Sequence, residues 1–331
     1  MSGLIISDRR ERALVRTADA LLAPAALLRR RMDASPPPAR ILCLRLERIG
    51  DLLMTLPALA ALRSAYRAAH IDLAVGSWNR ELASALPMVD AVLTLDAAWL
   101  ARADGGVGVA GLLRRAFDWR RVRYDLAINF EPDIRSNAAA RASGAGIAAG
   151  FASGGGGALL DVAVDYDATV HTRDNALALV RAIAGASASV PAGALLAIPA
   201  SHRDAAQARL GSDDRLFVGM HVSGGRLVKQ WPLEQFRETA RRLIADRGAT
   251  IVFTGARADR ALIDDVCSTL PRSHVIDAAS EDSLLTVAAI LERVALLVTG
   301  DTGPMHLGVA VATPVVALFG STNPVRTGPY G

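Results

Sequence analysis

The sequence predicts an α/β protein with two doubly wound domains, each built on a parallel β-sheet with helices on both faces. Three observations lead to this prediction. Short apolar runs alternate with helical patterns along the chain, which is the spacing typical of parallel sheets. The alternation stops near residue 185 and restarts near residue 216. The chain has 331 residues, 51% of them hydrophobic, which is enough apolar material for two cores.

The first domain is predicted over residues 40–185. Its strands are expected at residues 41–46, 71–75, 92–95, 125–130 and 162–164, and its helices over 52–69, from 79 onward and over 172–184. Residues 96–118 and 150–160 are expected to be loops, because each contains a glycine-rich stretch.

The second domain is predicted over residues 213–331. Residues 186–212 are rich in Ala, Ser, Gly and Pro, and we interpret them as the interdomain linker. Strands are then expected at 216–221, 250–254, 275–276, 295–298 and 314–319, with helices over 233–247, from 259, over 283–293 and over 303–311. Sheets of this kind bind ligands at the carboxyl ends of their strands.

Residues 1–39 form an N-terminal extension of different character. Residues 5–31 predict an arginine-rich amphipathic helix with Leu14, Ala18, Leu21 and Leu22 on one side, and the prolines at 36–38 end it. Two interpretations are open. A basic amphipathic helix can lie on an anionic membrane surface, or the segment is an appendage of its own domain.

Composition excludes several classes of protein. The two cysteines, Cys43 and Cys267, are too few for a disulfide scaffold or a cysteine zinc site, and they fit a reducing compartment. Aromatic residues make up only 5% of the chain, so a stacking platform for nucleic acid is not expected. No apolar run is long enough to span a membrane, and the charged start does not fit a signal peptide. We therefore predict a cytoplasmic protein.

The first segment that carries chemistry is Arg45-Leu-Glu-Arg-Ile-Gly50-Asp51, directly after the first core strand. A glycine here lets the backbone approach a ligand closely, at the start of a helix whose N-terminus favours negative charge. Asp51 is a candidate catalytic carboxylate. The alternative is that it only complements the helix dipole.

The second segment runs from His221 to Pro232 and contains Ser223, Gly224 and Gly225. These residues offer backbone N–H groups and a hydroxyl, and Lys229 supplies a point charge of the kind that a phosphate leaving group requires. The alternative is an ordinary glycine-rich loop with a solvated lysine.

The third segment, residues 298–306, predicts an anion site at a helix N-terminus. Thr302 suits the N-cap and Pro304 the first turn. The amides of Gly303, Met305 and His306 would then face an anion, most simply a diphosphate. Asp301 is either a ligand of the same group or a buried residue that holds the loop.

Together these segments resemble glycosyltransferase family 9, the heptosyltransferases of lipopolysaccharide inner-core synthesis. The family pattern is R-x-x-x-I-G-D after a strand, then a glycine-rich loop with K-x-W-P, then D-[ST]-G-P-M-H-L followed by T-P-V-V-A-L-F-G. The chain contains all three in order, the last at residues 313–320. The resemblance covers residues 40–331, and residues 133–136 and 171–177 are similar to acceptor-domain segments of the family.

The resemblance implies a GT-B-like fold, with two Rossmann-like domains whose parallel sheets face a central cleft. It also implies an inverting transfer of a sugar, typically heptose from ADP-heptose, to a lipid-linked oligosaccharide acceptor, without a metal. Asp51 matches the general base and Lys229 the residue that neutralises the departing diphosphate. The implied donor-binding residues are Ser223, Gly224, Asp259, Asp301, Thr302, Gly303, Met305 and His306, with Asp259 on the ribose, and the implied acceptor-binding residues are Gly50 and Arg135.

Two alternatives to this function are open. One is a different nucleotide-sugar reaction on the same fold, such as an epimerisation; the other is a catalytically silent nucleotide-sugar-binding protein. The family pattern usually continues beyond Gly331 into a helix that crosses back to the first domain, and residues 1–39 precede the pattern. Peripheral contact with the inner membrane surface is expected if the acceptor is a lipid, and nucleic acid is not an expected partner.

Overall fold

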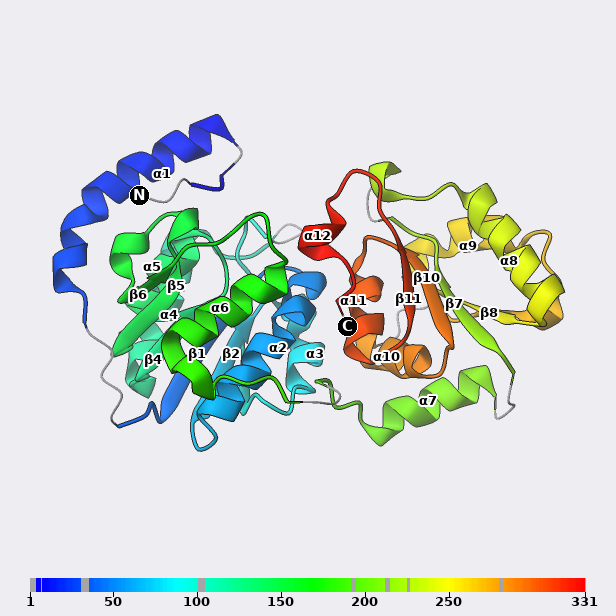
Figure 1. The fold of residues 1–331 in the computed structure, drawn as a ribbon, viewed down its shortest axis with the longest axis horizontal. Helices are drawn as coiled ribbons and strands as arrows, with labels where there is room; N and C mark the ends of the chain where they lie inside the picture. The colour runs from blue at the N-terminus through cyan, green and yellow to red at the C-terminus, as the bar shows by residue number, and fades with distance from the viewer. Residues whose placement is uncertain are drawn as a thin grey trace. The chain divides into compact units, whose positions relative to one another are not determined.

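The chain forms two compact units, Met1–Gly193 and Ala194–Gly331. The computed structural model describes residues 4–6, 8–30, 36–100, 105–191, 195–211, 215–224, 227–279 and 283–330. Each unit is built on one parallel sheet with helices packed on it (Figure 1). The predicted α/β class with two parallel-sheet domains is therefore confirmed. Across the described ranges, no helix is both long and apolar enough to cross a membrane.

Unit 1 contains a six-stranded sheet in the order β3-β2-β1-β4-β5-β6. Its winding direction reverses between β1 and β4, and the crevice at such a point is where doubly wound sheets bind ligands. Its strands are β1 Arg40–Arg45, β2 His70–Val75, β3 Ala91–Thr94, β4 Leu126–Asn129, β5 Ile147–Phe151 and β6 Val162–Val164. Its helices are α1 Arg9–Leu22, α2 Ile49–Ala65, α3 Arg80–Ser84, α4 Val109–Asp118, α5 Ile134–Ala142 and α6 Thr172–Ala184.

The core of unit 1 is centred on β1. Residues 41–44 of this strand are fully buried, as expected for a parallel strand covered on both faces. Leu42 and Leu44 pack in one cluster with Leu112 and Ala116 of α4 and with residues of α5. Helices α2 and α6 pack against each other in front of the sheet in Figure 1. The end of β1 is thus fixed from both sides.

Unit 2 repeats this plan with a five-stranded sheet in the order β11-β10-β7-β8-β9. The winding reverses between β7 and β10, so a second ligand crevice is expected there. The strands are β7 Phe217–His221, β8 Thr250–Thr254, β9 Val275–Asp277, β10 Leu296–Gly300 and β11 Val315–Leu318. The helices are α7 Ala200–Leu210, α8 Leu233–Arg247, α9 Arg260–Cys267, α10 Leu284–Glu292, α11 Gly303–Ala310 and α12 Pro324–Thr327.

The N-terminal extension is helical but shorter than predicted. Helix α1 ends at Leu22, and a 3₁₀ segment, η1 Ala23–Leu28, follows. The change occurs at Pro24, which cannot donate the backbone hydrogen bond that would continue the α-helix. The side of α1 that faces the unit contains Val15, whereas Leu14 and Leu21 are 72% and 78% exposed. Of the predicted apolar side, Ala18 and Leu22 are half-buried on the same side as Val15, and only Leu14 and Leu21 face solvent.

Three segments that the sequence predicted to be irregular have regular structure. Part of the loop predicted at residues 150–160 belongs to β5, which pairs with β4 and β6. Helix α4 lies in the region 96–118, and the predicted linker contains α7, whose Ala206 and Leu210 are buried. The turns after β5 do require glycine, because Gly155 and Gly156 have φ values of 90° and 72°.

Gly154 supports the loop between β4 and α5, which carries Asp133 and leads into Arg135 at the start of α5. A Cβ atom at Gly154 would overlap the carbonyl group of Pro132 and come within 2.5 Å of the Asp133 nitrogen. We expect Gly154→Ala to lower stability by about 1–3 kcal/mol or more, because backbone must move to admit the methyl group. Gly108→Ala is the matched control, since a Cβ there has no heavy atom within 4 Å. Urea unfolding of both variants tests this, and equal midpoints would contradict it.

Candidate functional site

Most candidate residues of each unit follow the two strands between which its sheet reverses direction. In unit 1, β1 and β4 are neighbours with Leu44 opposite Asn129, so the loops that follow these strands meet. In unit 2, β7 and β10 are neighbours with His221 opposite Thr299. The segments chosen from sequence therefore occupy the two crevices that the topology provides.

Arg45 is the central charge of the unit 1 site. Its side chain is 3% exposed, and a buried cation needs carboxylates and hydrogen-bond acceptors around it. Nη1 donates to the Phe130 carbonyl at 2.7 Å and lies 2.7 Å from Glu47 Oε2. Burial lowers the pKa of Arg45, but Glu47, Asp51 and Glu131 outweigh it and raise the pKa above its ordinary value.

Glu131 joins the two loops of this site. It is buried, and its Oε1 accepts from the backbone N–H groups of Leu46 and Glu47, the latter at 3.1 Å. The other oxygen accepts from the Ser136 hydroxyl. Burial raises the pKa of Glu131 in spite of these hydrogen bonds and of Arg45. A single carboxylate thus holds the β1–α2 loop against the start of α5.

Asp51 lies in the first turn of α2, as does Gly50. Its Oδ2 accepts from the Arg48 N–H at 3.2 Å, and Oδ1 lies 3.7 Å from Arg45 Nη2. Arg45 Nε also donates to the Asp51 carbonyl at 3.2 Å. The Asp51 side chain is 33% exposed. Its carboxylate is therefore accessible to an incoming group, although the residue is held through its carbonyl and through one carboxylate oxygen.

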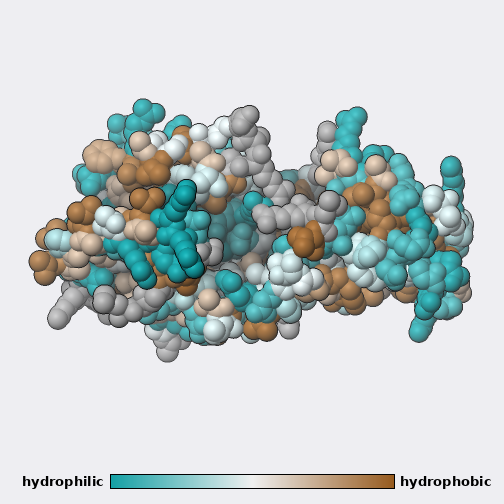
Figure 2. Space-filling view, turned by 90° about the horizontal axis from the view of Figure 1, so that it is seen from above, coloured by the Kyte–Doolittle hydropathy of each residue, from teal (hydrophilic) through white to brown (hydrophobic). Residues whose placement is uncertain are grey.

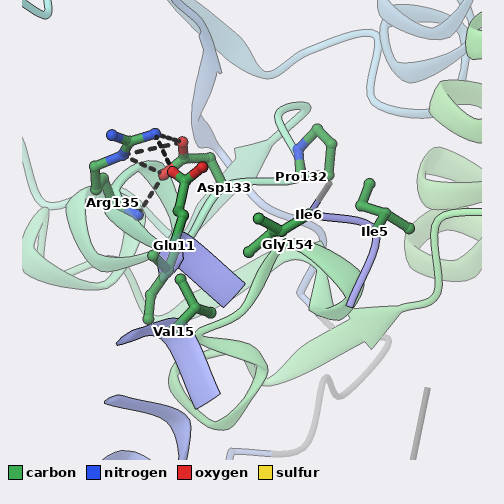
Figure 3. A pocket seen from close by; sticks show the side chains of 9 residues that line it. Ile5, Ile6, Glu11, Val15, Pro132, Asp133, Arg135 and Gly154 are labelled. Carbon is green, nitrogen blue, oxygen red and sulfur yellow. Dashed lines mark hydrogen bonds and ion pairs between the residues drawn. The ribbon is translucent and has the colours of Figure 1, made fainter. Parts of the chain in front are cut away.

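Arg135 lies at the start of α5, where it lines a cavity of about 280 Å³. Its Nε is 2.9 Å from Asp133 Oδ1, its Nη2 is 3.7 Å from Glu11 of α1, and its guanidinium stacks 4.4 Å from the Trp99 ring. Figure 3 shows Arg135, Asp133 and Glu11 together at one side of the cavity, with Ile5 and Ile6 at the other. The N-terminal extension therefore supplies one wall of this cavity.

The loop after β7 closes onto the ends of β10 and β11. A Cβ at Gly300 would lie 3.2 Å from the Lys229 carbonyl, and one at Gly320 would lie 3.4 Å from the Val228 carbonyl. Gly224, which is buried, is packed in the same way against the backbone of Gln230. These three glycines bring the Lys229 loop close to the strand ends. Ser223 is half-buried beside Gly224, and Gly225 lies outside the described residues.

Lys229 and Asp301 form an ion pair inside unit 2. Lys229 Nζ donates to Asp301 Oδ2 at 2.6 Å, and the two side chains are 26% and 10% exposed. Asp301 comes directly after β10, so the pair fixes the lysine ammonium beside the start of α11. Asp301 therefore has a partner within the protein. This contact fits the second of its two predicted roles, that of a buried residue that holds the loop.

The N-terminus of α11 has no side-chain cap, although Thr302 occupies the N-cap position. The Thr302 hydroxyl lies 3.1 Å from the Thr299 hydroxyl instead. The Met305 amide donates to the Thr302 carbonyl at 3.2 Å. The prediction that this amide is free to bind an anion was therefore wrong. The side chains of Met305 and His306 are buried. Gly303 is therefore the better placed of the predicted backbone donors.

Asp259 follows β8, one strand away from β7. Its Oδ2 accepts from the Ala256 N–H at 2.8 Å and closes the turn before α9. Its ribose-binding role stays a prediction. The neighbouring His221 is buried, and burial lowers its pKa although Asp259 and the Thr254 carbonyl act in the opposite direction. Thr254 O and His221 Nδ1 are 3.0 Å apart.

Sequence reasoning missed the structural importance of Glu131, Arg45 and Glu47. Glu131 lies two residues after β4, the strand that pairs with β1. An acidic residue at this position was the signal from which it could have been predicted. Among the described residues, no group of three His, Cys, Asp or Glu side chains has the arrangement of a metal site.

The protonation of Glu47 gives a test of this network. Burial and the carboxylates of Asp51, Glu131 and Asp133 raise the pKa of Glu47 to about 8, against the effect of Arg45. A raised pKa means that the folded protein binds the proton more tightly, so this stability is present at acid pH and is lost as the pH rises through 8.

We expect the Tm of the wild type to fall, relative to Glu47→Gln, by a few degrees between about pH 5 and about pH 9. Scanning calorimetry across this range measures it. Glu234→Gln, an exposed glutamate on α8, should follow the wild type at every pH. A constant difference between wild type and Glu47→Gln would show that Glu47 titrates normally.

Comparison with known proteins shows which family this chain belongs to. The family model for glycosyltransferase family 9 (heptosyltransferase) matches residues 113–331. The lipopolysaccharide core heptosyltransferase OpsX of Haemophilus influenzae is 22% identical over 298 residues, which is 88% of this chain and 82% of OpsX.

Two solved structures show that the fold is shared. The family 9 glycosyltransferase of Veillonella parvula has a TM-score of 0.77 at 24% identity, covering 91% of this chain and 86% of that one. The E. coli heptosyltransferase WaaC with ADP has a TM-score of 0.66 at 22% identity, covering 86% and 88%. With more than half of its residues matched by the family model, the chain belongs to glycosyltransferase family 9, the heptosyltransferases, and is a glycosyltransferase.

Proposed function

We propose that this enzyme transfers a heptose, with inversion, from ADP-heptose to the core of lipopolysaccharide or a related lipid-linked acceptor. In this reaction Asp51 removes the proton of the acceptor hydroxyl, whose oxygen attacks the anomeric carbon of the donor. The bond between that carbon and the diphosphate oxygen breaks on the opposite side. Lys229 and the start of α11 stabilise the negative charge that the leaving diphosphate gains.

The observation that best supports the proposal is that Lys229, from the loop after β7, lies beside the start of α11. Its ammonium is held by Asp301 at 2.6 Å, beside a helix N-terminus without a side-chain cap. A fixed cation and helix amides together suit a diphosphate. These groups supply the positive charge, so we propose that the chemistry needs no metal. The WaaC structure with ADP, which has a similar fold, supports the choice of nucleotide.

The role of Asp51 is supported by its surroundings in unit 1. One carboxylate oxygen is bound to the Arg48 N–H and the other faces the buried Arg45. A base that is fixed in this way needs little reorganisation when it takes a proton. Gly50 and Arg135 are proposed to contact the acceptor, Gly50 because it adjoins Asp51 and Arg135 because it lines the neighbouring cavity.

The proposed place of action is the cytoplasmic face of the inner membrane. Both cysteines are free thiols, and Cys43 is buried, as suits a reducing compartment. A lipid-linked acceptor is anchored in a bilayer, so the enzyme must reach its surface.

The donor site is tested by calorimetry of ADP, UDP and GDP, each with and without Mg²⁺. We expect ADP to bind best and equally well in both conditions, and Lys229→Ala to weaken ADP by about 10–100-fold, because a charged hydrogen bond is lost. Arg242→Ala, which removes an exposed cation on α8, is the matched control and should leave the affinity unchanged. Tightest binding of UDP or GDP would overturn the choice of donor.

The base is tested by Asp51→Asn, which keeps an oxygen for the Arg48 N–H. We expect kcat for heptose transfer to fall by about 10²–10⁴-fold while ADP affinity is unchanged, because only proton removal is lost. Transfer is followed by mass spectrometry with ADP-heptose and a heptose-free core acceptor. A kcat within about threefold of wild type would remove Asp51 from the mechanism.

A further inference from the structure

The N-terminal segment 8–30 presents leucines to solvent. Leu14 and Leu21 of α1 are 72% and 78% exposed, and Leu27 and Leu28 of η1 are 88% and 73% exposed. Leu14 and Leu21 are seven residues apart, so they lie two turns apart on one helix face. Figure 2 shows hydrophobic surface beside hydrophilic surface on the unit that carries α1.

The carboxylates of the same segment are engaged with the protein. Asp8 caps α1 by accepting from the Glu11 N–H at 2.8 Å. Glu11 lies 3.7 Å from Arg135, and Asp19 accepts from the Gly156 N–H at 2.6 Å. All three acidic side chains of residues 8–30 therefore have a partner within unit 1.

The arginines of the segment outnumber these carboxylates by six to three. Arg29 and Arg30 donate to the carbonyls of Gly157 and Gly146 at 2.9 Å each, which anchors η1. Arg9, Arg10 and Arg16 are exposed on α1, and Arg10 lies one turn before Leu14 on the leucine face. The outward side of the segment thus combines apolar side chains with positive charge.

We propose that α1 and η1 form a docking surface for an anionic phospholipid bilayer, into which Leu14, Leu21, Leu27 and Leu28 insert. The arginines on α1 attract the lipid phosphates, while the apolar side chains enter the boundary of the acyl chains. Charge complementarity selects this occupant, because a second copy of the same basic surface would be repelled. Docking needs no change of structure, since Glu11 and Asp19 already contact residues of unit 1 and Asp8 caps its own helix.

The test uses the full chain and sedimentation with vesicles, in the absence of donor and acceptor. Its outcome is thus separate from that of the proposed transfer reaction. Vesicles of phosphatidylethanolamine with phosphatidylglycerol are compared with vesicles of phosphatidylcholine alone. We expect binding to the anionic vesicles only, and we expect added salt to weaken it.

Two double variants separate the two forces. Leu14→Ser with Leu21→Ser removes apolar contact, and Arg10→Gln with Arg16→Gln removes charge, and each should lower the fraction bound at least about tenfold. Val109→Ser with Phe117→Ser is the matched control, because these α4 side chains are 44% and 58% exposed on the same unit. It should bind as the wild type does.

Three results would overturn the proposal. The first is equal binding to anionic and neutral vesicles, and the second is equal loss of binding in the α4 control. The third is a wild type that does not bind vesicles, together with a lower molecular mass of the leucine variant than of the wild type in light scattering. This result would show that the surface joins two copies of the chain. Circular dichroism of each variant confirms that α1 is folded.

Discussion

The unit 1 site depends on one buried cation. Arg45 extends from the last position of β1 into a space surrounded by three carboxylates, and its burial is tolerable only because they are there. This requirement explains the rest of the site. Glu131 needs the backbone N–H groups of the β1–α2 loop, and the loop in turn needs Arg45 to hold the carbonyl of Asp51. The position of Asp51 is therefore set by groups that need not touch the substrate.

In unit 2 the candidate residues are positioned by close packing of the backbone rather than by a buried charge. Glycines at 224, 300 and 320 allow the Lys229 loop to lie against two strand ends, and a single ion pair then directs the lysine. The charge in this unit is more exposed than Arg45. The cation that we propose to meet a diphosphate must stay accessible, whereas one that only holds a loop is best kept from water.

Much of the fold could be predicted from the sequence, because most strands are buried on both faces and give continuous apolar runs. The strands β6 and β8 have the predicted bounds. The prediction missed β5, whose Ile147-Ala-Ala-Gly-Phe151 has little β-propensity and is a strand because β4 and β6 pair with it. It missed α7 because an alanine-rich segment gives no clear apolar stripe, although Ala206 and Leu210 are buried.

Site residues that belong to short motifs could be predicted from the sequence. Residues that come together only through the pairing of strands could not. Asp51, Lys229 and Thr302 were predicted as site residues because each belongs to a local sequence pattern. Glu131 was not, since its role depends on the pairing of β1 with β4, which no local window contains. The pairing of Lys229 with Asp301 similarly joins loops 72 residues apart.

Helix α1 has two faces with different tasks, and this has a mechanical consequence. One face, with Glu11 and Val15, forms a wall of the cavity beside Arg135; the other carries the exposed leucines. Because the two faces belong to one 14-residue α-helix, the outer face cannot move without moving that wall. A surface bound to the leucines would therefore hold the wall, and with it the width of the cavity, in one position.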